Sequence, residues 1–280
     1  MRHSKKSQIA EVNDKQQYGP SKKTSASRKN HGSSGKQLQQ LSRLYDEAMD
    51  TYNQSALAKT IEDMLRTKNR PRITKIVSLG LGSLFDAKDQ QRRIKQLVVL
   101  MAIASHLALP LGDKDNFTLY AQDPTFTAAD ETFLESLGIF VLKTTSISSL
   151  GEAGRIMDEE TLVYSPFLTL ETYKLLFSSS STNAPILVSD DFNALRLKWD
   201  KRTSERRDVE GLIQGTRAGN YRRRAVNGEG FWTEADRPFP MALYWRQSIT
   251  QDLPVSRNVE STIRYSVFPK VEHHRIPIHA

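Results

Sequence analysis

The stretch Lys75–Leu100, KIVSLGLGSLFDAKDQQRRIKQLVVL, contains the features that decide the fold. An apolar strand, Ile73–Leu79, runs into the glycine turn Gly80–Ser83, and an amphipathic helix follows over roughly Asp89–Leu107. The two glycines of the turn allow left-handed backbone and the close approach of another molecule. A strand, a glycine turn and a helix in this order begin many nucleotide-binding folds. The stretch therefore predicts the first β-α unit of such a fold.

Short apolar strands and amphipathic helices alternate from this unit to residue 192. Four further strands are predicted, at Phe117–Gln122, Ile139–Leu142, Thr161–Tyr164 and Ile186–Ser189. Such alternation is typical of a parallel sheet with helices on both faces, and right-handed crossovers make it doubly wound. The predicted fold class is therefore α/β, with a Rossmann-like, doubly wound, mainly parallel sheet of about five strands. A helical lead-in over residues 37–70 precedes the sheet.

The basic charge of the chain is concentrated in its first 36 residues. The chain has 280 residues and a formal net charge of +8, and Met1–Lys36 contain nine Lys or Arg and two acidic residues. Residues 37–280 carry 31 basic and 30 acidic residues and are close to neutral. Because the first segment has few apolar residues, it cannot bury enough surface to offset the entropy lost on ordering. We expect residues 1–36 to be a disordered basic tail, either a solvated linker or a nuclear-targeting or polyanion-binding arm.

The composition disfavours several kinds of chemistry. The chain has no cysteine, which excludes disulfides, thiolate nucleophiles and cysteine-ligated zinc. His106 is the only histidine between His31 and His273, and it lies near the end of an apolar helix, which disfavours a Ser-His-Asp hydrolase. The longest apolar run, Leu97–Ala104, has eight residues, fewer than the ~20 needed to span a bilayer. We expect no metal site and no membrane span, and a location in the cytoplasm, the nucleus or both.

The chain changes in character after Phe192. Residues 193–250 are rich in basic residues and contain all three tryptophans of the chain. We interpret them as a basic, aromatic extension packed on or near the sheet, with Met241–Gln247 as an added edge strand, and residues 251–280 as a loose C-terminus. Basic residues interleaved with aromatic ones can also bind RNA. The candidates for such an alternative are Trp199, Arg222, Arg223 and Arg224.

A candidate ligand-binding crevice lies at the predicted ends of the strands. Ligands of an open parallel sheet bind beyond the carboxyl ends of its strands, where the strand order reverses. The residues that follow these strands are Gly80, Leu81, Gly82, Ser83, Asp123, Ser165, Phe167, Asp190 and Asp191. None of them is assigned a catalytic role.

The turn fits a diphosphate ligand poorly. Phe85 stands where the dinucleotide-binding fingerprint has its third glycine. Asp86 and Asp89 lie at the start of the following helix, and a carboxylate near a phosphate there costs roughly 3 kcal/mol. This repulsion prevails unless a neighbouring basic side chain turns inward, the candidates being Lys88, Arg92 and Arg93. A neutral or cationic ligand is still compatible with the turn. The enzymatic alternative is therefore a methyltransferase-like protein that binds S-adenosylmethionine.

Several segments together carry a resemblance to a known family. They are IVSLGLGSL, QQRRIKQLVVL, YAQDPTFTAADETFLESLGIFVL, TLVYSPFLTLETYKLLF and PILVSDDF, within about residues 70–192. The most specific is the Asp-Pro-x-Phe element formed by Asp123, Pro124 and Phe126. This pattern resembles the sensitivity-to-red-light-reduced (SRR-like) domain family, and the extension looks like that of fungal members.

The resemblance implies a Rossmann-like SRR-like domain over residues 37–192 and brings no established reaction. Members of the family are linked to light and circadian signalling, haem metabolism, and microtubule or stress phenotypes. Many of them have a Pro-His-Cys triplet where this chain has Ser165-Pro166-Phe167, so the side chains best suited to metal binding or catalysis are missing. We therefore expect a regulatory or interaction protein that binds a partner or a ligand, for instance a haem-related one, without turnover. The methyltransferase-like alternative would hold S-adenosylmethionine with Gly80, Gly82 and Asp123.

Overall fold

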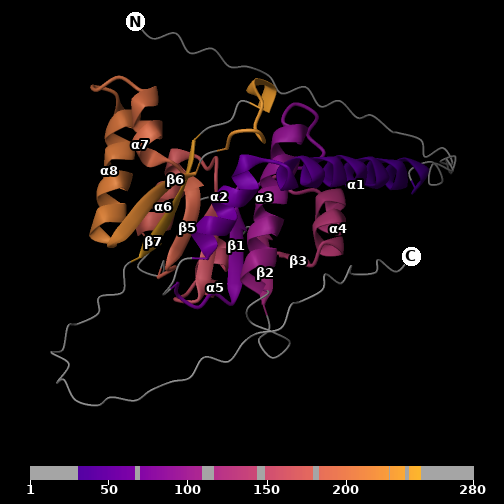
Figure 1. Ribbon diagram of the computed structural model, residues 1–280, viewed down its shortest axis with the longest axis horizontal. Helices are drawn as coiled ribbons and strands as arrows, with labels where there is room; N and C mark the ends of the chain where they lie inside the picture. The colour runs from indigo at the N-terminus through magenta and orange to yellow at the C-terminus, as the bar shows by residue number, and fades with distance from the viewer. Residues whose placement is uncertain are drawn as a thin grey trace, which may run out of the picture. The chain divides into compact units, whose positions relative to one another are not determined.

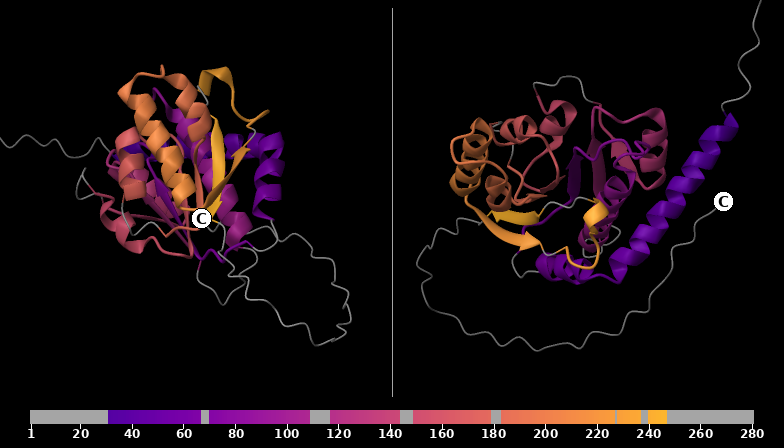
Figure 2. Two further views of the ribbon diagram at one scale, coloured as in Figure 1. Left: turned by 90° about the vertical axis from the view of Figure 1, so that its left-hand side faces the viewer. Right: turned by 90° about the horizontal axis from the view of Figure 1, so that it is seen from above.

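The architecture is a seven-stranded sheet with helices on both faces (Figures 1 and 2). The computed structural model describes residues 31–66, 70–108, 117–143, 149–178, 183–226, 228–236 and 240–246. The strands are β1 (Lys75–Leu79), β2 (Thr118–Gln122), β3 (Ile139–Val141), β4 (Thr161–Ser165), β5 (Ile186–Asp190), β6 (Tyr221–Val226) and β7 (Met241–Arg246). The helices are α1 (His31–Asn53), α2 (Ala56–Leu65), α3 (Gln90–Ala108), α4 (Ala128–Ser136), α5 (Gly151–Ile156), α6 (Leu170–Ser178), α7 (Phe192–Leu195) and α8 (Ser204–Ala218). The predicted Rossmann-like α/β fold is confirmed.

The strand order is β3-β2-β1-β4-β5-β7-β6. The first five strands pair in parallel, and they are the five that the sequence predicts. β7 pairs antiparallel with both β5 and β6. It is therefore an inner strand of the sheet, whereas the sequence suggested an edge strand at Met241–Gln247. The edge on this side is β6, which the sequence did not predict. Together β7 and β6 extend the five parallel strands to a sheet of seven.

The helical lead-in begins earlier than the sequence suggests. α1 starts at His31, inside the segment 1–36 that was expected to be a disordered tail. Once a helix has formed its first turn, each further residue adds a hydrogen bond at little extra cost, so the helix continues beyond its apolar stripe. The rest of that tail, residues 1–30, and the expected loose C-terminus, residues 251–280, lie outside the described residues. No helix in the described ranges is long and apolar enough to cross a bilayer.

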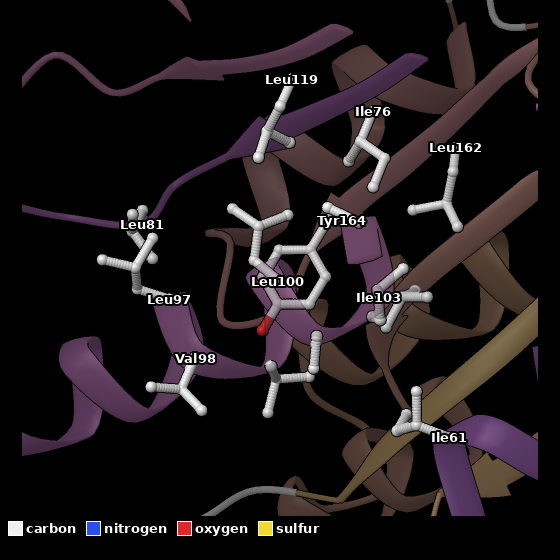
Figure 3. Packing of buried hydrophobic residues seen from close by; sticks show 14 of the residues in the cluster. Ile61, Ile76, Leu81, Leu97, Val98, Leu100, Ile103, Leu119, Leu162 and Tyr164 are labelled. Carbon is white, nitrogen blue, oxygen red and sulfur yellow. The ribbon is translucent and has the colours of Figure 1, made fainter. Parts of the chain in front are cut away.

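Two apolar clusters, one on each face of the sheet, form the core. Helices α1 to α4 contribute to one cluster, and α5 to α8 contribute to the other. In the first cluster, Leu100 and Ile103 of α3 pack against the fully buried ring of Tyr164 in β4 (Figure 3). The Tyr164 hydroxyl donates to the backbone carbonyl oxygen of Gln96 at 2.8 Å, and burial raises the pKa of this hydroxyl well above its usual value. α3 is thus fixed against the centre of the sheet by packing and by a buried hydrogen bond.

Candidate functional site

A cleft of about 350 Å³ lies where β1, β2 and β4 end. Of the nine predicted crevice residues, those that line it are Gly80, Leu81, Gly82, Asp123 and Phe167. The others are buried beside the cleft without lining it, and they are Ser83, Ser165, Asp190 and Asp191. α3 adds Arg92, Arg93 and Gln96 to the lining. The structure therefore brings about half of the predicted residues together and surrounds them with side chains of α3.

The glycine turn uses its own N–H groups within the protein. Gly80 and Gly82 both have a φ of 74°, which is the left-handed region that favours glycine. The Gly82 N–H donates to Asp123 Oδ2 at 2.8 Å, and the Ser83 N–H donates to Thr125 Oγ1 at 3.1 Å. A phosphate cradle needs such N–H groups to be free for the ligand. The turn therefore shapes the cleft but does not form a cradle.

Asp123 anchors this turn from the end of β2. Its Oδ1 accepts from the backbone N–H of Thr125 at 2.8 Å and from the Thr125 hydroxyl at 2.6 Å, while its Oδ2 holds Gly82. Both carboxylate oxygens are thus engaged within the protein. Pro124 lines the cleft, whereas Phe126 packs against the core. The Asp-Pro-x-Phe element consequently joins the glycine turn to the segment that begins α4.

The two arginines at the start of α3 turn inward. Arg93 Nη1 lies 3.0 Å from Asp86 Oδ2 and donates to the Ser83 carbonyl oxygen at 2.6 Å. Arg92 Nη2 lies 3.2 Å from Asp89 Oδ1, and its guanidinium lies over the Phe167 ring, 5.4 Å from the centroid. In the sequence analysis, a phosphate ligand was disfavoured because Asp86 and Asp89, at the start of this helix, would repel it. Because both acids are paired, their repulsion is weaker than predicted, and the occupied N–H groups are the stronger argument.

Phe167 is held in the cleft by a buried carboxylate. It has a φ of 68°, a conformation that is strained for a bulky residue. The Phe167 N–H donates to Asp190 Oδ1 at 3.0 Å, and Asp190 Oδ2 lies 3.1 Å from the Tyr173 hydroxyl. Burial raises the pKa of Asp190 to about 6, although these two hydrogen bonds favour the charged form. Asp190 therefore positions a residue of the cleft and does not face the cleft itself.

The raised pKa of Asp190 makes the stability of the fold depend on pH. Between about pH 4 and 6 the folded protein binds one more proton at Asp190 than the unfolded chain. The stability linked to this proton is present below about pH 4 and is lost as the pH rises through 6. Asp190→Asn keeps an acceptor for the Phe167 N–H and removes the titration. Urea unfolding at pH 4, 5, 6 and 7 should show the wild type losing about 2–3 kcal/mol relative to Asp190→Asn across this window. If the free energy of unfolding changed with pH in the same way for both proteins, Asp190 would not have a raised pKa in the folded state.

Two predicted site residues pair with each other. Arg223 of β6 makes a two-pronged ion pair with Asp191 at the end of β5, and its Nε lies 2.7 Å from Asp191 Oδ1. The Asp191 side chain is only 5% exposed, so its charge is compensated within the protein. Arg222 and Arg224 remain exposed on β6. Trp199 is half-buried and packs against the second core cluster, so the four residues named as RNA-binding candidates are not all exposed.

Sequence reasoning gave two polar residues no part in the site, although it indicated Asp130 as the partner of Thr127 in a capping box at the start of a helix, which the structure confirms. Asp130 of α4 is fully buried, and its Oδ1 accepts from the Leu84 N–H at 2.6 Å. Gln96 is buried and lines the cleft from α3. Its position four residues after Arg92 and three after Arg93 puts the three on one helix face, a signal that could have found it. Within the described ranges, no group of three or more His, Cys, Asp or Glu side chains could hold a metal ion.

The fold and the cleft define a Rossmann-like α/β protein with an opening at the carboxyl ends of its central strands. The family model of the SRR1 domain matches residues 38–235, and the chain belongs to this family. The match confirms the resemblance and extends it beyond residue 192, through β6 and the segment that follows it. The particular similarity of the C-terminal extension to fungal members of the family is still a prediction.

Solved structures with a related arrangement include three proteins of low identity. A fibrillarin pre-rRNA processing protein from Methanococcus jannaschii has 13% identity and a TM-score of 0.37, covering 67% of this chain and 74% of its own. Cofactor-bound Rv0187 from MTB has 8% identity and a TM-score of 0.43, covering 74% and 88%. Aeropyrum pernix fibrillarin with natively bound S-adenosyl-L-methionine has 10% identity and a TM-score of 0.38, covering 66% and 72%. At such TM-scores these likenesses assign no activity to this chain. A comparison with curated proteins finds no match.

Proposed function

We propose that this SRR1-domain protein is a regulatory or interaction protein that binds a small ligand or a partner segment in the strand-end cleft without turnover. The observation that carries the proposal is a cleft of about 350 Å³ at the ends of β1, β2 and β4. This volume and this place in an open α/β sheet are typical of ligand sites. A role in light, circadian or stress signalling and a cytoplasmic or nuclear location belong to the same proposal.

The acids near the cleft are used by the fold, which supports binding without chemistry. A general base needs a carboxylate within reach of the substrate proton. Asp123 lines the cleft, but its two oxygens accept three hydrogen bonds from the turn and from Thr125. Asp190 and Asp191 are buried away from the lining. The groups that face a ligand are instead arginine, glutamine, threonine and apolar side chains, which suit recognition.

A thermal-shift screen with a cleft-filling variant tests this function. Gly82 is unsuitable for substitution, because its φ is 74° and a Cβ would lie 2.5 Å from Arg93 Nε, so any side chain strains the turn. Leu175 of α6 is half-buried and lines the cleft, and Leu175→Trp fills it from one wall. We expect at least one compound among nucleosides, haem precursors and S-adenosylmethionine to raise the melting temperature of the wild type. Leu175→Trp should abolish the shift.

The control is Glu171→Trp, an exposed position on the same helix outside the cleft, which should keep the shift. Mass spectrometry of the compound after prolonged incubation should show it unchanged. A shift that Leu175→Trp leaves intact would place binding elsewhere, and a chemically altered compound would contradict the absence of turnover.

An S-adenosylmethionine-dependent methyltransferase is the alternative that the glycine turn and the acid at the end of β2 favour. This function would need Gly82 and Asp123 to turn toward the cofactor, yet they hydrogen-bond each other at 2.8 Å. Calorimetry with millimolar S-adenosylmethionine separates the two functions. A flat titration removes the methyltransferase, whereas binding together with methyl transfer would replace the proposal above.

RNA binding through β6 is the second alternative, and it rests on the exposed Arg222 and Arg224. If these arginines contact RNA phosphates, the binding affinity must fall steeply as the salt concentration rises. For single-stranded RNA, each phosphate contact lowers the logarithm of the binding constant by about 0.7 for every tenfold increase in salt concentration. Binding that is absent or insensitive to salt would remove this alternative.

A further inference from the structure

Gln96 is a largely buried residue whose carboxamide has no hydrogen-bond partner among the residues that the structure describes. The residue is 2% exposed and lines the cleft. Its backbone carbonyl oxygen accepts from the Tyr164 hydroxyl. Its carboxamide, in contrast, makes no hydrogen bond with any residue that the structure describes. The carboxamide atoms are not among the fully buried atoms without a partner, so they keep access to solvent and to a ligand in the cleft that the residue lines.

Such an arrangement is uncommon in a helix that is otherwise apolar. The neighbours of Gln96 along α3 are the buried Ile94, Leu97 and Val98. Buried side-chain amides are nearly always hydrogen-bonded, and leaving one without a partner is unfavourable. A leucine at this position would fit the apolar pattern of the helix. The amide consequently points to a partner outside the chain.

The surroundings of Gln96 restrict the chemistry of this partner. The cleft wall includes the apolar side chains of Leu81, Leu150 and Leu168 and the aromatic ring of Phe167. Arg92 and Arg93 are the basic residues of the lining, and both are paired with acids. The N–H groups of Gly82 and Ser83 are also occupied. The cleft thus offers an apolar wall, the carboxamide of Gln96 and the Nε–H of Arg92, which makes no hydrogen bond within the described protein. The charges of both arginines are compensated by acids, so no positive site is left for a phosphate.

We infer that the cleft binds a neutral heteroaromatic compound whose edge carries a hydrogen-bond donor beside an acceptor, as a nucleobase does. Gln96 reads this edge with both atoms of its carboxamide, since an amide offers a donor and an acceptor side by side. Glutamine pairs with adenine in this two-pronged way in protein–DNA complexes. The ring of the ligand packs against the apolar wall that Leu81, Leu168 and Phe167 form. This inference rests on the proposed function of the cleft and specifies the class of its ligand.

Calorimetry with the full chain tests the inference with four probes, namely adenosine, guanosine, cytidine and uridine. We expect at least one nucleoside to bind the wild type, and its 5′-monophosphate to bind no more tightly. Gln96→Leu should weaken the binding at least ~10-fold, as expected when a two-pronged contact is lost. Gln91→Leu is the matched control, because Gln91 is exposed on the same helix outside the cleft, and it should leave the affinity unchanged.

A second measurement separates recognition from a structural role. Because Gln96→Leu replaces a carboxamide that has no partner in the described protein with an apolar side chain that suits the helix, the unliganded variant should melt no lower than the wild type. A structural role would instead lower the melting temperature and leave nucleoside affinity unaltered. Equal affinity of the wild type and Gln96→Leu for a bound nucleoside would overturn the inference.

The outcomes also distinguish this inference from the proposed function. If no nucleoside binds the wild type while another compound gives a thermal shift that Leu175→Trp abolishes, the ligand class is wrong and the cleft is still the binding site. If no compound of the screen gives a shift that depends on Leu175, both the inference and the proposed function fall.

Discussion

Asp130→Ala is expected to lower the free energy of unfolding by about 4 kcal/mol, the largest effect that we predict for one polar residue. Asp130 is fully buried. Its Oδ1 accepts from the Leu84 N–H at 2.6 Å, and its Oδ2 accepts from the N–H and the hydroxyl of Thr127 at 2.8 and 2.7 Å. Hydrogen bonds to a charged group contribute about 1.5–3 kcal/mol each, and a buried donor left alone adds a further cost. Urea unfolding followed by circular dichroism measures the loss.

Glu135→Ala is the control for this variant, because Glu135 is an exposed acid on the same helix. It should change stability by less than about 0.5 kcal/mol. Asp130→Asn keeps one acceptor oxygen and should lie between the two. An Asp130→Ala protein as stable as Glu135→Ala would show that the link between the glycine turn and α4 is not needed for the fold.

Arg223→Met is expected to destabilise the protein by about 2–3 kcal/mol. The substitution leaves the Asp191 carboxylate, 5% exposed, without its partner, and an unpaired buried charge is strongly unfavourable. The effect falls below that of a fully buried pair because the Arg223 side chain is 33% exposed and partly screened by water. Denaturant unfolding of the variant at pH 7 measures it.

Arg222→Met is the matched control, since Arg222 is exposed on the same strand, and it should be nearly neutral. The double variant Asp191→Asn with Arg223→Met should recover part of the loss, because it no longer buries a charge. Equal stability of Arg222→Met and Arg223→Met would mean that the pair contributes nothing and that Arg223 is as available to a partner as Arg222.

The parallel half of the sheet could be predicted because its strands are apolar. β1, β4 and β5 are buried along nearly their whole length, and such strands appear in the sequence as continuous apolar runs. β6 could not be predicted in this way. Its residues 222–225 are exposed, so nothing in Tyr221–Val226 alternates between core and solvent. The strand exists because it pairs with β7, and pairing partners are not visible in local sequence.

The candidate site was predictable where it depends on local chain geometry. Gly80, Gly82 and Phe167 follow strands, and their place in the cleft comes from the topology of the sheet alone. The bonds between distant side chains and backbone were not predictable. Asp130 reaches the Leu84 N–H across 46 residues, and Asp191 reaches Arg223 across 32. Acids that the sequence offers as ligand-binding groups can therefore be satisfied by partners that only the folded chain brings near.

We propose that the acids around the cleft serve the fold and that Gln96 performs the recognition. The most direct measurement is an assigned ¹H–¹⁵N spectrum of the full chain during addition of the four nucleosides, one at a time. We predict that one of them shifts the side-chain amide resonances of Gln96 together with the backbone signals of Gly82 and Phe167. An unmoved Gln96 amide, with shifts confined to residues 222–224 or absent throughout, would contradict the claim.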